Sequence, residues 1–205
     1  LAEEVVATMS AEDVEFVEVT AELPCLDPAL CDHLTGRQDS ASRLDHFVLA
    51  NLFTDRDAEV RGLFRYHRIF AAEMARRRRT RAPEAARRTL GEASDWYRDR
   101  GDTDRAVEAG LRAGDGARVA VLLRAVSGSK LRGGQAAQLV GWMERMPQAD
   151  LWRDPALALA LARACGLSGD SLTPRAVLRA TQADPAMSDP PLGLRVVRAQ
   201  LESSI

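Results

Sequence analysis

Apolar and polar positions divide the chain into two differently patterned parts. In the first, apolar residues recur every three or four positions in short blocks, each preceded by a residue that favours a helix start. The pattern predicts helices over residues 1–9, after Ser10, after Asp27 and after Asp39. Residues 14–19 are rich in Val and would also suit a strand, but the Ser10 cap and the later Pro24 favour a helix.

A β-hairpin is predicted next, from Leu52-Phe53-Thr54, polar residues 55–61 and Leu63-Phe64-Arg65-Tyr66. Two short helices around a turn at Gly36, followed by this hairpin, match a helix-turn-helix with a wing. A further helix begins at His67, with Ile69, Phe70 and Met74 on its apolar side. We therefore predict a winged-helix domain over residues 1–82, ending where Ala82-Pro83 breaks the helix.

The second part, residues 83–205, reads as pairs of amphipathic helices. Small and aromatic residues recur there at tetratricopeptide-like spacing, namely Ala93, Tyr97, Gly101, Ala106 and Ala113, with a weaker echo over residues 169–177. Further helices are predicted over residues 116–126, 135–146, 156–165 and 192–201. The predicted fold class is all-α with a small β-hairpin wing, a winged-helix domain followed by an incomplete set of tetratricopeptide-like antiparallel helical hairpins.

Charge is unevenly distributed and bears on what the winged helix could bind. Residues 1–60 carry 14 acidic residues against 3 Arg, a net charge of −11, and residues 61–100 carry 12 Arg against 5 acidic residues, a net charge of +7. In a DNA-binding winged helix, the helix after Asp39 would be the recognition helix. Its one arginine, Arg43, is offset by Asp45, so we expect this domain to contact protein or nucleotide and not to read DNA. Basic residues end the helix that starts near His67: Arg76, Arg77, Arg78, Arg79 and Arg81. They are interpreted as a solvated helix end or, alternatively, as a polyanion patch.

Motifs for independent catalysis are missing from the sequence. It contains no P-loop, HExxH, GxSxG or paired CxxC, so we expect no catalytic residues and no enzymatic activity in this chain. Cys25, Cys31 and His33 could supply three metal ligands, but no second close pair would complete a site, and no metal is expected. Three cysteines, an odd number without the spacing of a disulfide framework, and the lack of a long apolar run predict a cytoplasmic protein without membrane contact.

Five motifs, taken together in their order along the chain, resemble those of a known protein family. They are Cys31-Asp32-His33-Leu34-Thr35-Gly36, Leu49-Ala50-Asn51-Leu52-Phe53, Tyr66-His67-Arg68-Ile69-Phe70, the Trp96-Tyr97, Gly101 and Ala106 hairpin, and residues 139–147. Their order and spacing resemble those of the large LuxR-type, MalT-like transcriptional regulators, which are signal-transduction ATPases of the STAND class. The resemblance implies a fragment that holds the winged-helix domain and the start of a sensor. The nucleotide-binding domain would precede Leu1, and the DNA-binding domain would follow Ile205.

What the resemblance implies for function centres on His67. Residues 66–70 look like the Met-His-Asp motif of related STAND proteins, whose histidine contacts the β-phosphate of ADP; Arg68 departs from that motif. The fragment would itself hold no cofactor, but its parent would bind and hydrolyse ATP, and an inducer or regulatory protein on the helical repeats would alter the nucleotide state. The alternatives are that His67 only packs at the wing, that the chain is a scaffold in another STAND protein, or that the wing and arginines bind nucleic acid.

Overall fold

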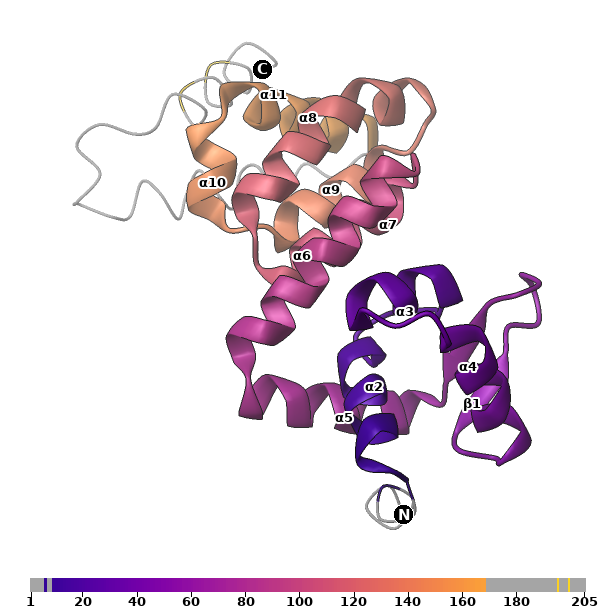
Figure 1. Ribbon diagram of the computed structural model, residues 1–205. Coiled ribbons are helices and arrows are strands. Elements are labelled where there is room, and N and C mark those ends of the chain that lie inside the picture. The colour runs from indigo at the N-terminus through magenta and orange to yellow at the C-terminus, as the bar shows by residue number, and fades with distance from the viewer. Residues whose placement is uncertain (1–5, 7–8, 169–194, 196–198, 200–205) are drawn as a thin grey trace. The chain divides into compact units, whose positions relative to one another are not determined.

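The structure is a computed structural model that describes residues 6, 9–168, 195 and 199 (Figure 1). The chain divides into two compact units, Leu1–Arg100 and Gly101–Ile205, which are described separately below. The predicted helices over residues 1–9 and 192–201 fall mainly outside the described residues. The weaker repeat echo at residues 169–177 lies wholly outside them.

Unit 1 is helical with one small hairpin, which confirms the predicted fold class. Its elements in order are α2 (Ala11–Thr20), α3 (Pro28–Thr35), α4 (Ser40–Leu49), β1 (Thr54–Arg56), β2 (Phe64–Tyr66), α5 (Arg68–Arg81) and α6 (Pro83–Asp99). The two strands pair antiparallel, with Asp55 opposite Arg65, and form the predicted wing. Helix α2 packs against α3 and α5, and α6 packs against α3 and α5.

Local capping explains why most of these helices start and end where the sequence predicts. The Ser10 hydroxyl accepts a hydrogen bond from the Asp13 N–H, and the Asp27 carboxylate accepts one from the Ala29 N–H. Gly36 ends α3 in the left-handed region, with φ of 68°. Helix α4 starts at Ser40, directly after Asp39, as predicted. Asp39 makes no side-chain cap; instead, Asp32 on α3 accepts a hydrogen bond from the Ser40 N–H at 3.0 Å.

The core of unit 1 joins helices to the wing. Phe16 on α2 and Phe47 on α4 are buried and meet edge to face, with 5.9 Å between their ring centroids. Leu26 pairs with Phe64 in an isolated antiparallel bridge, which adds a third extended segment beside the hairpin. Of the three residues predicted for the apolar side of α5, Phe70 and Met74 are buried, but Ile69 is 80% exposed. The prediction for Ile69 was wrong because the buried face starts one position later.

Unit 2 is helical over its described residues. It contains α7 (Thr103–Ala113), α8 (Gly116–Arg132), α9 (Ala136–Arg145), α10 (Gln148–Arg153) and α11 (Pro155–Ser168). Helix α8 packs against its neighbours α7, α9, α10 and α11. Asp154 starts α11 as predicted, accepting a hydrogen bond from the Ala156 N–H, whereas α8 runs six residues past the predicted end at residue 126 and α10 was not predicted.

The predicted repeat residues fall in both units. Ala93 and Tyr97 are buried on α6, Ala106 and Ala113 are buried on α7, and Gly101 has a φ of 77°. That they pack together as one tetratricopeptide-like hairpin stays a prediction. So does the domain boundary after residue 82: α5 does end there, at Arg81, but the compact unit continues through α6 to Arg100.

Candidate functional site at the junction of the wing and helix α5

His67 lies where the wing passes into α5. Its backbone N–H donates to the Phe53 carbonyl at 2.7 Å, and the residue occupies the N-cap position of the helix. The imidazole Nε2 lies 2.8 Å from Oδ2 of Asp55 on β1. The His67 side chain is 51% exposed and that of Asp55 is 70% exposed. The backbone of His67 is therefore held in place by a hydrogen bond, and its Nε2 atom bonds a carboxylate at the protein surface.

The backbone that supports His67 is unusual. Asn51 and Phe53, in the segment between α4 and β1, have φ values of 53° and 48°. Positive φ in a residue other than glycine is uncommon and concentrates at sites where the surrounding structure holds the chain in place. The Phe53 ring contacts the His67 ring edge to face at 5.5 Å and stacks on Phe70 at 5.3 Å, measured between ring centroids. This packing holds one side of the imidazole against an apolar surface.

Arginines at the end of α5 bind one carboxylate on the neighbouring helix α2 and one just after that helix. Glu18 is buried, with 1% of its side chain exposed, and forms ion pairs with Arg81 and, at 3.7 Å, with Arg77. Glu22, with 7% of its side chain exposed, pairs with Arg79. Glu18 on α2 and Glu22, which follows the end of that helix, thus meet arginines on α5, and the contacts of Glu18 join the two helices.

The other two arginines of the cluster also have partners in unit 1. Arg76 forms a two-pronged contact with Glu73 on its own helix. Arg78 donates to the Thr89 hydroxyl at 3.0 Å, and burial lowers the pKa of its guanidinium. A role of the cluster as a polyanion patch stays a prediction. An incoming anion would compete with these carboxylates for the guanidinium groups.

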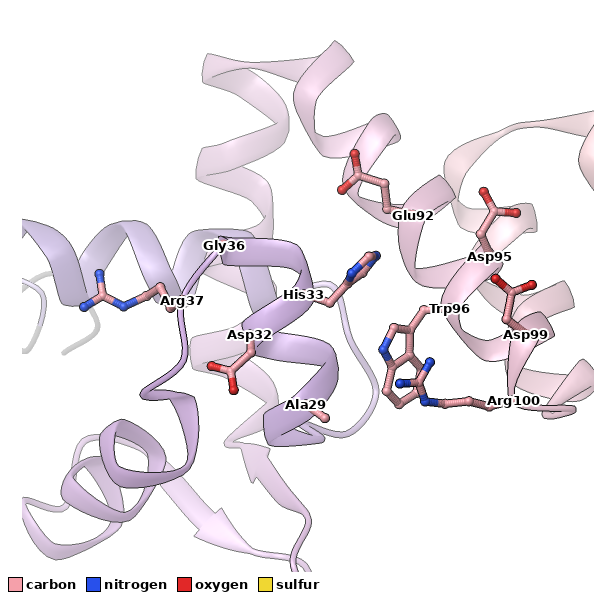
Figure 2. A pocket seen from close by; sticks show the side chains of 10 residues that line it. All are labelled: Ala29, Asp32, His33, Gly36, Arg37, Glu92, Asp95, Trp96, Asp99 and Arg100. Carbon is pink, nitrogen blue, oxygen red and sulfur yellow. The ribbon is translucent and has the colours of Figure 1, made fainter.

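A hollow of about 660 Å³ lies between α3 and α6 (Figure 2). His33 extends toward it from α3, and Trp96 extends from α6 with the Arg100 guanidinium 3.6 Å from its ring centroid. Its lining residues are mostly polar: Ala29, Asp32, His33, Gly36, Arg37, Glu92, Asp95, Trp96, Asp99 and Arg100. Asp32 and Arg37 already bond within the chain, to the Ser40 N–H and to Asp39.

The two cysteines of unit 1 are buried thiols. Cys25 and Cys31 are buried and form no disulfide, and burial raises the pKa of the Cys31 thiol well above its usual range. Within the described part of the chain, no group of three or more His, Cys, Asp or Glu side chains is placed to hold a metal ion. Nor does any helix among the described residues have the length and apolar character needed to cross a membrane.

Residues 2–86 match the family model of the MalT winged helix domain. The match covers the segment from the chain start through α5 into the first residues of α6, including His67, Asp55 and the arginine cluster. With the hairpin and helices described above, it shows that this part of the chain is a winged-helix domain. It also supports the interpretation of the chain as a fragment of a MalT-like protein. Comparison with curated proteins found no match to the chain.

Three residues of this winged-helix domain escaped the sequence reasoning. Asp55 was read only as a polar wing residue, Glu18 as one of many acidic residues, and Asp32 as part of a family motif. A signal existed for Glu18: Arg77 and Arg81 stand at i and i+4, on one face of a predicted helix, so a single carboxylate of a neighbouring helix can meet both. For Asp55 the sequence offered no such signal, because its contact with His67 depends on the hairpin register, which the structure shows.

Proposed function

We propose that this chain is a regulatory and signal-sensing part of a MalT-like transcriptional regulator. Its winged-helix domain would report the nucleotide state of a neighbouring ATPase domain, and His67 would contact a phosphate of bound ADP. The match of residues 2–86 to the MalT winged helix domain supports the first part of this proposal. The position of His67 supports the second.

The observation that carries the proposal is the half-exposed imidazole whose Nε2 already faces an anionic oxygen at 2.8 Å. A histidine N–H can donate to a phosphate oxygen as it does to a carboxylate, and such charge-assisted bonds are among the stronger hydrogen bonds. The backbone of His67 is fixed at the start of α5 and its ring rests on Phe53. Little side-chain freedom would therefore be lost when a phosphate arrives.

Transmission of the signal would use the winged-helix domain as a rigid body. The ion pairs of Glu18 with Arg77 and Arg81 join α2 to α5, and His67 lies at the other end of α5 from the arginines. A movement of α5 would therefore carry α2 and the wing with it. An inducer or regulatory protein bound to the helices of unit 2 would favour the arrangement in which His67 leaves the ADP phosphate. DNA would be bound by a separate C-terminal domain of a cytoplasmic parent protein.

The test is the affinity of the parent protein for ADP and for ATP, wild type against His67→Ala. Loss of one charge-assisted hydrogen bond costs about 1.5–3 kcal/mol, so ADP binding should weaken by roughly 10- to 150-fold. ATP binding, which belongs to the opened state, should change less. His46→Ala is the matched control because His46 is exposed on α4 in the same domain. Equal ADP affinity of wild type and His67→Ala would refute the proposed contact.

A further inference from the structure

We propose that Asp55 occupies the place on His67 that the nucleotide phosphate takes, so that the wing carboxylate and the phosphate compete for the same imidazole nitrogen. This inference rests on the proposed function of His67. It assigns Asp55 as the residue that sets how readily His67 is available to ADP. The wing would then act as a built-in competitor of the nucleotide.

The local pairing of the wing directs Asp55 to His67. Arg65 lies directly opposite Asp55 in the hairpin register, and an ion pair between them would be the simplest arrangement. Arg65 instead pairs with Asp57, whose carboxylate also accepts the N–H groups of Glu59 and Val60 and is 2% exposed. The Asp55 carboxylate is thereby left to bond His67 across the junction.

The competition follows from the bonding capacity of one ring nitrogen. Nε2 carries a single hydrogen and donates to one acceptor at a time with good geometry. Nε2 is also the nitrogen farther from the backbone, and Phe53 packs against the ring. A phosphate that approaches from outside the domain therefore meets the nitrogen that Asp55 now holds. A carboxylate oxygen and a phosphate oxygen are both anionic acceptors of similar reach, so one can replace the other.

The exposure of the pair sets how strong this competition is. With 51% and 70% of their side chains exposed, His67 and Asp55 form a solvent-screened contact. Such pairs contribute about 0.2–1 kcal/mol, which corresponds to roughly 1.4- to 5-fold in an equilibrium constant. Asp55 would thus tune the affinity of the site for ADP without blocking it. A pair of this strength can open at each nucleotide exchange.

The experiment measures ADP affinity of the parent protein carrying Asp55→Ala, with Asp55→Asn as a second variant that keeps the side-chain shape. Both should bind ADP about 1.4- to 5-fold more tightly than wild type. In a His67→Ala background, Asp55→Ala should have no effect. Glu59→Gln is the matched control, because it removes one negative charge from the same wing at a residue whose N–H bonds Asp57. If Glu59→Gln gives the same gain, the effect is a general field and the proposal is wrong.

A second readout does not depend on nucleotide. In the ADP-free protein, the side-chain ¹⁵N resonances of His67 should shift in Asp55→Ala and stay unchanged in Glu59→Gln. The two failures can be told apart. Unchanged ADP binding in His67→Ala refutes the proposed function. ADP binding that depends on His67 but is unchanged or weakened by Asp55→Ala, or His67 resonances that do not respond to that variant, overturns the role of Asp55.

Discussion

The contact between Glu18 and the α5 arginines predicts an asymmetric response to mutation. Glu18 has 1% of its side chain exposed, whereas Arg81 and Arg77 are 65% and 36% exposed. Removing the arginines leaves a carboxylate in the interior, while removing the carboxylate leaves arginines that water can solvate. The two changes break the same contact. Their costs should differ because a buried charge without a partner is expensive.

The expected magnitudes follow from this exposure. Loss of the partner of a buried charge costs about 3–5 kcal/mol, and we expect the lower end for Arg77→Met with Arg81→Met because Arg78 also lies close enough to attract Glu18. Glu18→Gln should cost about 1 kcal/mol, since the amide keeps part of the hydrogen bonding. In the Glu18→Gln background, the two arginine replacements should add less than about 1 kcal/mol.

Urea unfolding followed by circular dichroism measures these free energies, and amide hydrogen exchange of α2 localises the loss to unit 1. Arg76→Met is the matched control. It removes a neighbouring arginine of the same helix whose partner Glu73 is 29% exposed, and it should cost at most about 1 kcal/mol. If the double arginine variant is no less stable than Arg76→Met, the asymmetry argument is refuted.

Two further predictions concern single contacts. Asp32→Ala should destabilise unit 1 by about 1 kcal/mol, because Asp32 caps α4 at Ser40; urea unfolding that is unaffected by this change would contradict the assignment. In unit 2, burial alone would raise the pKa of Asp104, but hydrogen bonds from Lys130 and Gln138 lower it overall. A lowered folded-state pKa means that this contact stabilises the fold above the ordinary carboxyl pKa and less as pH falls through the lowered value. The difference in melting temperature between wild type and Asp104→Asn should therefore shrink on acidification, and a constant difference would count against it.

Local signals made most of unit 1 predictable from the sequence. Ser10, Asp27 and Gly36 determine helix ends through hydrogen bonds or backbone angles within a few residues, and such contacts can be read from the chain itself. The wrong prediction for Ile69 is also a local one, an error of one position along α5. The buried face of this helix is set by the side chain that packs into the core, and that side chain is the neighbouring Phe70.

Contacts between distant segments could not be read in the same way. The bridge of Leu26 to Phe64 and the cap of Asp32 on Ser40 depend on how α3, α4 and the wing pack together. In the candidate site, too, the local feature could be predicted and the distant contact could not. The motif at residues 66–70 pointed to His67, but its partner Asp55 depends on the register of a hairpin whose loop length the sequence left open.

The most direct test of the account is the distance from His67 Nε2 to the nearest phosphate oxygen in a structure of the parent protein with ADP bound. We expect a hydrogen bond of about 2.7–3.2 Å, with Asp55 displaced from the nitrogen that it contacts at 2.8 Å in the present structure. An ADP-bound structure in which His67 still pairs with Asp55 and lies beyond hydrogen-bonding reach of every phosphate oxygen would contradict it.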